Sequence, residues 1–332
     1  VLVAFVLSFT VGLQVAQAGK MERLLRELEI QLERPGFGRD FYVCQSNSPF
    51  YSTAVKKYEP YADGVRRLYT SITNSYNACV ADRGDTIYLV SGFTNTALRH
   101  ITLSKNSISI IGIGPDRPTL GATGTEKLIT VLADNITLKG LHLIPSRATS
   151  TYIIKVDGGT LDPVKDLLIE DCYIEGGVPW GRPNDVIVLD SAENLVIKDT
   201  RITSPYGTVF DPATFVDFQT HCTNTRIDNC VFDGFVSSAG IADDAPGKGL
   251  VMTNVIIAVT QTNAAIPAIT LDSNPIGVAS NCMFSGTEDV TRTNANLGIN
   301  MAMQNCMILG GHFITLRRWS GTPLAQEGIT NP

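Results

Sequence analysis

Charge is scarce in this sequence, and so is histidine, the side chain that catalytic centres use most often. Charged residues make up 17% of the 332 residues, and there are 4 histidines. The net charge is −6 and no block of Lys and Arg stands out, so nucleic acid is not a predicted partner and association with an anionic membrane is not expected. Nucleotide-binding glycine motifs are absent too, because Gly112 and Gly114 lead to Pro115 rather than to a helix.

Apolar residues, in contrast, make up 44% of the chain, which is enough for a packed core. The 7 cysteines cannot all pair within one chain, and no Cys-x-x-Cys metal pattern occurs among them. We therefore expect buried thiols that act as small apolar fillers. Unpaired thiols favour assembly in a reducing compartment.

The first eighteen residues carry no charge and end in Ala16-Gln17-Ala18, which is similar to a signal-peptide cleavage site. The segment is barely long enough to cross a bilayer. Three interpretations stay open: an uncleaved signal, a membrane anchor, or an apolar arm buried against a partner protein. We favour the arm.

A short amphipathic helix is predicted over residues 21–34, ended by Pro35 and Gly36. One face of this helix carries four leucines, which are candidate contacts to a partner: Leu24, Leu25, Leu28 and Leu32. Residues 36–62 are predicted to be an irregular loop region. A second helix is expected from about residue 65 to residue 81, followed by a turn and a strand over residues 86–90.

Beyond this point, short β-rich runs alternate with Gly, Asn, Asp and Pro, and the runs repeat. A first marker, the Asp or Asn before a position that is often Cys, recurs at intervals of 24 to 30 residues: Asp171, Asp199, Asn229, Asn254, Asn281 and Asn305. The segments around Gly112 and Gly140 extend this register. A second, acidic marker precedes the first in each unit: Asp157, Asp190, Asp217, Asp244 and Asp272.

A unit of this length cannot bury its own apolar face, so the units are predicted to stack as the coils of a parallel β-helix. Stacking at about 4.8 Å closes the backbone hydrogen bonds between neighbouring coils. The Asp or Asn suits a sharp bend, because it tolerates left-handed backbone angles. One column of side chains is expected to hold Cys172, Cys230, Cys282 and Cys306. The helix at residues 65–81 is expected to cap the first coil.

Four segments carry a resemblance to a known family: GDTIYLVSGFTNT, ITLSKNSISIIGIGPDRPTL, DNITLKGLHLI and DLLIEDCYIEGG. They resemble the pectate-lyase-like right-handed β-helix superfamily, and are closest to capsid cement or decoration proteins of tailed phages. The resemblance covers roughly residues 65–316. It implies a right-handed, single-stranded parallel β-helix in a trimeric protein on a phage head. The predicted organisation is an N-terminal arm (1–64), the β-helix with its cap helix (65–319) and a C-terminal tail (320–332).

No residue is predicted to be catalytic or to bind a cofactor or metal. The Asp column could gather a hard cation, but we favour strand-closing aspartates bonded to local backbone. His142 is expected to face outward between two buried leucines, and His221 and Cys222 to point to opposite faces. Trp180 lies in a Gly/Pro-rich loop and is a further candidate for partner contact.

The function expected from these features is that of a virion structural protein that binds the major capsid protein and stabilises a phage head. It would be assembled in the host cytoplasm, act at the capsid surface, and not be an enzyme. The alternative is a polysaccharide-binding or polysaccharide-cleaving protein, such as a tailspike or a secreted lyase. A surface adhesin held by a membrane anchor is the third possibility.

Overall fold

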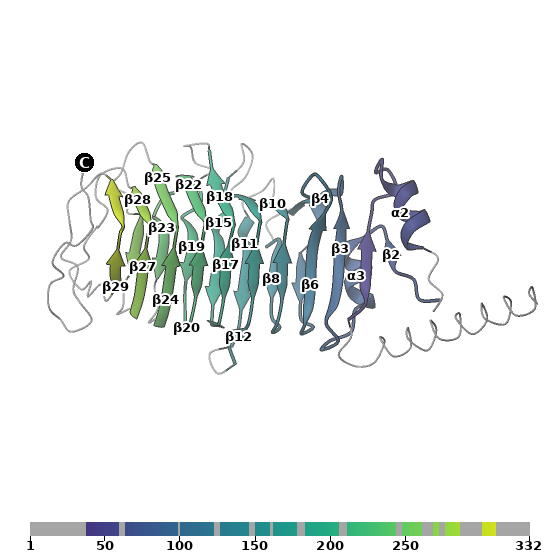
Figure 1. Cartoon of the computed structure of the whole chain (residues 1–332), viewed down its shortest axis with the longest axis horizontal. Helices are drawn as coiled ribbons and strands as arrows, with labels where there is room; N and C mark the ends of the chain where they lie inside the picture. The colour runs from purple at the N-terminus through teal and green to yellow at the C-terminus, as the bar shows by residue number, and fades with distance from the viewer. Residues whose placement is uncertain are drawn as a thin grey trace, which may run out of the picture.

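The protein is an elongated stack of β-coils with two short helices at one end (Figure 1). The computed structural model describes residues 38–59, 64–98, 100–122, 127–145, 150–159, 162–177, 183–205, 211–243, 248–260, 268–271, 276–285 and 301–309. Strands that neighbour each other in its three sheets run parallel. The predicted fold class, a parallel β-helix, is confirmed.

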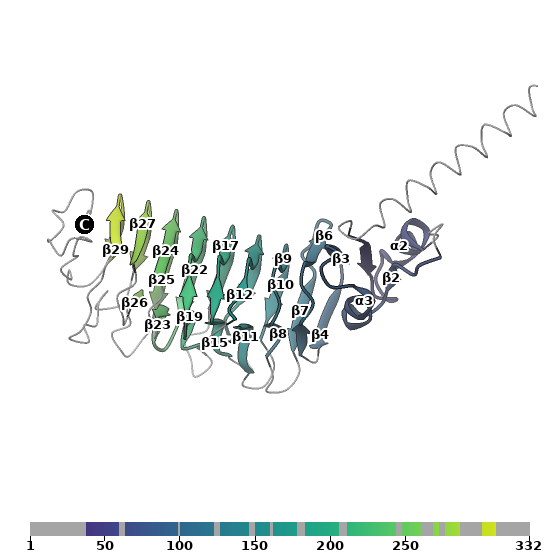
Figure 2. The ribbon, with the colours of Figure 1, turned by 90° about the horizontal axis from the view of Figure 1, so that it is seen from below.

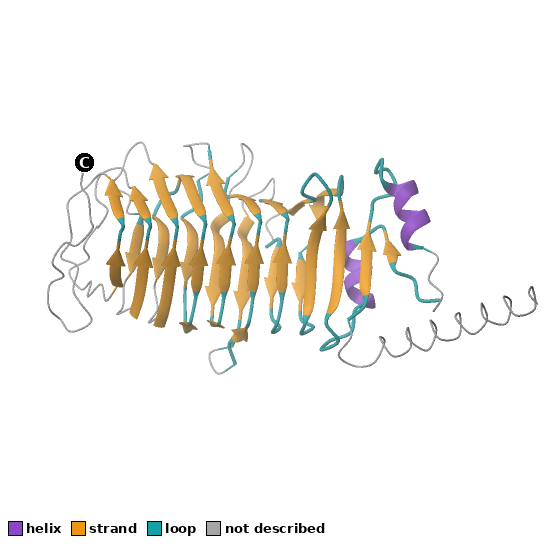
Figure 3. Cartoon of the chain, viewed as in Figure 1, coloured by secondary structure: helices purple, strands orange, loops and turns teal. Residues whose placement is uncertain are grey.

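Each coil contributes strands to three sheets, which we name A, B and C; Figure 3 shows that strands fill the stack. Sheet A holds β1 (Asp40–Val43), β2 (Leu68–Tyr69), β3 (Asp85–Val90), β6 (Ile108–Ile113), β9 (Thr137–Lys139), β12 (Val164–Lys165), β13 (Leu168–Glu170), β16 (Ala192–Glu193), β17 (Val196–Lys198), β20 (Cys222–Thr223), β21 (Arg226–Asp228), β24 (Lys248–Thr253), β27 (Ile276–Ser280) and β29 (Met301–Gln304).

Sheet B follows the bend after sheet A in every repeat. It holds β4 (Thr94–Leu98), β7 (Thr119–Ala122), β10 (His142–Ile144), β14 (Tyr173–Glu175), β18 (Arg201–Ser204), β22 (Val231–Phe235), β25 (Ile256–Thr260), β28 (Met283–Ser285) and β30 (Met307–Leu309). Sheet C holds β5 (Ile101–Leu103), β8 (Ile129–Val131), β11 (Ser150–Asp157), β15 (Pro183–Asp190), β19 (Thr214–Phe218), β23 (Ala239–Asp243) and β26 (Ile269–Leu271). Seen from below, the coils follow one another along the long axis (Figure 2).

At the bend between sheets A and B one residue takes left-handed backbone angles, as the repeat predicts. All six marker residues have a φ between 50° and 55°: Asp171, Asp199, Asn229, Asn254, Asn281 and Asn305. Gly140 takes the same place one coil earlier, with a φ of 66°. The side chains also link the coils, since Asn229 Nδ2 donates to Asp199 Oδ1 at 2.6 Å. The marker residue therefore has two roles: its backbone forms the bend within its own coil, and its side chain bonds to the neighbouring coil.

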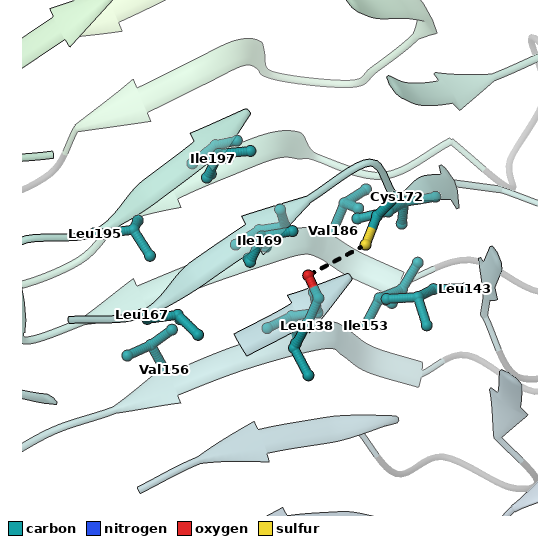
Figure 4. Close-up of a cluster of buried hydrophobic side chains, with 14 of the residues drawn as sticks. Leu138, Leu143, Ile153, Val156, Leu167, Ile169, Cys172, Val186, Leu195 and Ile197 are labelled. Carbon is teal, nitrogen blue, oxygen red and sulfur yellow. Dashed lines mark hydrogen bonds between the residues drawn. The ribbon is translucent and has the colours of Figure 1, made fainter. Parts of the chain in front are cut away.

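The core consists of inward side chains stacked in register. Ile169 and Ile197 pair across β13 and β17, and both are fully buried. Figure 4 shows this part of the core, where Cys172 Sγ donates to the carbonyl of Leu138 at 3.7 Å. All 7 cysteines of the chain are buried and unpaired in disulfides. The prediction that the thiols are buried is confirmed.

The N-terminal cap differs from the prediction in extent. The expected helix over residues 65–81 is reduced to α3 (Ile72–Ala78), because Leu68–Tyr69 forms strand β2 beside β1. The residues predicted to be irregular contain β1 and a helix, α2 (Tyr51–Tyr58). Since β1 also pairs with β3, sheet A begins before the predicted boundary at residue 65.

α3 nevertheless caps the first coil, as expected. Its residues Ile72 and Tyr76 belong to the same buried cluster as Phe41 and Ile87. Asp85, the first residue of β3, ties the cap to the coil, because its carboxylate accepts from the backbone N–H of Val80 after α3 at 2.7 Å and of Arg39 before β1 at 2.8 Å. It also accepts hydrogen bonds from Arg83 at 2.6 Å. Burial alone would raise the pKa of Asp85, but this pairing and two backbone N–H donors lower it. Among the described residues, no helix is long and apolar enough to span a membrane.

Candidate functional site

The most elaborate polar surface lies where sheets A and B meet, on the coils between residues 117 and 233. Each coil presents one outward residue just before the bend and another two positions after it. The parallel pairing places these residues in rows across the coils. We name this surface the charged edge; it consists of Arg117, Lys139, His142, Glu170, Asp171, Tyr173, Glu175, Lys198, Arg201 and Asp233.

The row before the bend is an ion-pair ladder centred on Glu170. Lys139 Nζ and Lys198 Nζ, from the coils on either side, each lie 3.1 Å from Glu170 Oε1. Burial of Glu170 would raise its pKa, but the hydrogen bonds from Lys198 and Lys139 outweigh burial and hold the pKa below its usual range. The carboxyl group is therefore ionised at neutral pH. It binds three coils together rather than supplying a proton.

Replacing Glu170 by glutamine is expected to lower the free energy of unfolding at pH 7 by about 0.5–1 kcal/mol, a small value because both lysines are partly exposed. The folded-state pKa of Glu170 is lowered, so its contribution is complete above the ordinary carboxyl pKa of about 4.3 and is lost as the pH falls through the folded-state value. Urea unfolding from pH 7 down to pH 3 measures this difference. In a Lys139→Met, Lys198→Met background the substitution should have no effect; an equal effect there would contradict the ladder.

The row after the bend brings together an imidazole, a phenol and a guanidinium. His142 Nε2 lies 2.9 Å from Glu175 Oε1, and its Nδ1 lies 3.2 Å from Thr119 Oγ1. The imidazole ring is 5.0 Å from the ring of Tyr173, which pairs in register with Arg201.

Charged partners flank this row on both sides. Arg201 Nη2 binds Asp233 Oδ2 at 2.8 Å. Arg117 binds the carboxylate of Asp171 at the bend. The row therefore offers partly exposed donors, acceptors and a flat ring on a rigid surface. This combination suits hydrogen bonding and stacking to a sugar chain. An imidazole–carboxylate pair is also the arrangement of a general base.

The predicted Asp column is wrong at its third member. Asp157 and Asp190 pair in register, but Asp217 lies opposite Val188, two residues away from the Asp190 position. The reason is that the connection from sheet B to sheet C varies in length between coils, so sequence spacing does not set this register. Asp244 and Asp272 lie outside the described residues.

A lysine side chain lies between the first two aspartates of the predicted Asp column, where a bound metal cation had been considered. Lys155 Nζ lies 2.9 Å from Asp157 Oδ1 and 3.4 Å from Asp190 Oδ2. Burial would lower the pKa of Lys155, but the bonds to Asp157 and Asp190 raise it above its usual value. The side chain therefore stays charged and joins two coils. Within the described ranges, no three His, Cys, Asp or Glu side chains converge as metal ligands.

The other predicted residues have mixed outcomes. His142 faces outward between the buried Leu141 and Leu143, and exposed His221 adjoins buried Cys222; both expectations are confirmed. The candidate contact residues Leu24, Leu25, Leu28, Leu32 and Trp180 lie outside the described residues.

Sequence reasoning missed the grouping of His142, Tyr173, Arg201 and Glu175. The residues that meet in this group are 28 to 33 positions apart in the chain, so no local sequence motif predicts the group. A signal was present, however. The first three each lie two residues after a bend marker, and aligning the repeats on that marker places them in one row.

No protein-family model matches this chain, and neither does any curated protein. Among solved structures, it is similar to a pectin methylesterase from Aspergillus niger, with a TM-score of 0.50, 11% identity, and 88% of this chain and 89% of that chain covered. A PL6 family alginate lyase matches with a TM-score of 0.40 and 12% identity, over 87% of this chain and 40% of that chain. The tailspike protein of an Acinetobacter phage matches with a TM-score of 0.38 and 10% identity, over 74% and 52%. The chain thus shares the fold of the pectin methylesterase, and at 11% identity this likeness concerns the fold alone.

Proposed function

We propose that this chain is a structural protein of a virus particle that binds the major capsid protein and stabilises the head as a cement or decoration protein. Residues 1–34 attach it to the capsid, and the β-helix projects from the capsid surface. The chain acts without catalysis in this proposal. Three copies associate around a closed symmetry axis, the usual arrangement of homo-oligomers.

The observation that carries the proposal is that outward charged side chains form ion pairs between neighbouring coils. Outward charged side chains bind partners on the neighbouring coils, as in the ladder around Glu170, the Lys155 cluster and the pair of Arg201 with Asp233. Ion pairs between coils add to the backbone ladder in holding the stack at a constant spacing. A stiff rod with an attachment segment before its first coil suits a part that must persist on a particle surface.

The number of copies per particle is the measurement that tests this proposal. We expect the chain to purify with intact particles in a fixed, stoichiometric ratio to the major capsid protein. Particles assembled without it should lose their contents more readily on heating and on transfer to low salt. A few copies per particle would instead indicate a tail component, and absence from particles would refute the proposal.

A second candidate function rests on the row of His142, Tyr173 and Arg201 with Glu175. Under this alternative the charged edge binds, or cleaves, an acidic polysaccharide. The guanidinium would pair with sugar carboxylates, and the phenol ring would stack on a sugar face. The imidazole–carboxylate pair would take up the proton in a cleaving enzyme.

Tyr173→Ala and Arg201→Ala distinguish the two candidates. If the charged edge binds polysaccharide, each substitution should weaken binding to alginate or pectate by at least about tenfold, equivalent to the loss of one good contact. Val231→Ala, in the same row one coil further on, is the matched control and should bind normally. Size analysis of the polysaccharide reports cleavage. If neither polysaccharide is bound or shortened by the unaltered chain, this alternative is excluded for these substrates.

A further inference from the structure

One cysteine pair differs from the other thiols of the chain. Cys282 and Cys306 occupy the same place in adjacent coils, directly after the bends at Asn281 and Asn305. Sheet A pairs Ser280 with Gln304 just before the bend, and sheet B pairs Met283 with Met307 just after it. The offset is 24 residues in both pairings, so the two cysteines are stacked in register.

Contacts around the bend confirm this stacking. The backbone N–H of Met307 donates to the carbonyl of Cys282 at 2.8 Å, and Asn305 Nδ2 donates to Asn281 Oδ1 at 3.4 Å. Cys306 Sγ reaches down to the carbonyl of Ala279 in the coil below, at 3.4 Å.

We propose that Cys282 and Cys306 are a reversible disulfide site that joins the last two described coils of the rod. Adjacent parallel strands lie about 4.8 Å apart, within the span of about 4.4–6.8 Å between the Cα atoms of a disulfide. The Cβ atoms of a disulfide approach to about 3.8 Å, so the bridge draws the two bends slightly together. Such strain makes a disulfide easier to reduce.

Cys172, Cys230 and Cys222 lack a suitable neighbour in the adjacent coils. In the same column, Cys172 is followed by Thr200, and Cys230 lies between Thr200 and Val255. Cys172 and Cys230 are therefore two coils apart, about 9.6 Å, which is beyond the reach of a disulfide. Cys222 pairs with Ala192. The chain thus contains its own negative controls.

The chemical step is thiol–disulfide exchange with a small disulfide oxidant such as glutathione disulfide. The neighbouring Cys282 thiol favours the thiolate of Cys306 and lowers the pKa of Cys306 below its usual value, although burial opposes this. The Cys306 thiolate attacks one sulfur of the oxidant and releases the first glutathione. Cys282 then loses its proton and attacks Cys306 Sγ, which releases the second glutathione. Two electrons and the two thiol protons end on the two glutathione molecules.

Access comes from the position at the end of the described stack. Both thiols are almost fully buried, at 2% and 1% exposure, so the oxidant reaches them only when a coil opens. Among the described strands, β29 pairs with β27 alone and β30 with β28 alone. Opening of a single coil is a local event that requires less free energy than unfolding of the whole stack. Formation of the bridge then holds that coil closed.

Thiol counting on the full-length chain tests the proposal. After incubation with glutathione disulfide and denaturation, the number of alkylatable thiols should fall from 7 to 7 − 2 = 5, and a peptide map should show Cys282 joined to Cys306. Reduced glutathione should restore all 7. Exchange of the backbone amide hydrogens of Asn281 and Met307, which bond to the neighbouring coil, should become at least about tenfold slower in the oxidised chain.

Serine variants provide the controls. Cys306→Ser should retain all six of its thiols in the oxidant, whereas Cys282→Ser should lose one, because Cys306 then stops at the mixed disulfide with glutathione. Cys172→Ser, at the same column position in another coil, should still lose two. If all seven thiols persist at a temperature where the Met307 amide exchanges, or if the bridge joins other cysteines, the proposal is wrong.

Discussion

Replacing Ile197 by aspartate is expected to prevent the chain from folding. Ile197 is fully buried in the middle of sheet A, where it pairs with Ile169 on one side and Ile227 on the other. The substitution removes a packed side chain, at a cost of about 2–5 kcal/mol, and places a carboxylate without a partner among apolar groups, at several kcal/mol more. Total stabilities of about 5–15 kcal/mol leave little after such a loss.

The adjacent residue is a matched control. Val196, on the same strand, faces outward beside Arg226 and is partly exposed. Val196→Asp should change the free energy of unfolding by no more than about 0.5 kcal/mol, as for ordinary surface substitutions. Soluble yield and circular dichroism during heating measure both variants. Equal destabilisation by the two substitutions would contradict the assignment of the inner and outer faces of β17.

Removing residues 1–34 is expected to abolish attachment to the capsid while the β-helix stays folded, if the proposed function is right. The segment combines an uncharged run with the four leucines of the predicted amphipathic face. Burying a leucine contributes about 1.5–3 kcal/mol, so loss of four such contacts weakens binding by far more than a hundredfold. Mixing the truncated chain with particles that lack the protein, followed by sedimentation, measures the bound fraction.

Two finer variants separate the apolar face from the rest of the segment. Replacing Leu24, Leu25, Leu28 and Leu32 by serine should reproduce the truncation. Replacing Arg23, Arg26 and Glu33 by serine should leave most binding intact, because these residues lie on the opposite face at helical spacing. Thermal unfolding should be the same for all variants. Full binding by the truncated chain would remove the arm from the proposal.

Much of the fold was predictable because the bend chemistry is local. A left-handed backbone angle favours Asn, Asp or Gly, so Asn229 and Gly140 mark bends without reference to the rest of the chain. Alternation around the bend then assigns inner and outer faces, which placed His142 outside and the cysteine column inside. The exact extent of the cap was not predictable in this way, because Leu68–Tyr69 is a strand only through its pairing with β1.

In the candidate site too, some features follow from the local sequence and others depend on how the coils pair. The coil period, the bends and the residue types that line each face could be predicted from the repeat, since these follow from backbone preferences and burial within one repeat. Which side chains meet across the coils became visible only in the folded chain: Glu170 with two lysines, His142 with Glu175, and Asp217 with Val188 rather than with another aspartate. The physical reason is that loops of variable length separate the sheets, so register between coils is set by backbone hydrogen bonds and core packing, not by distance along the chain.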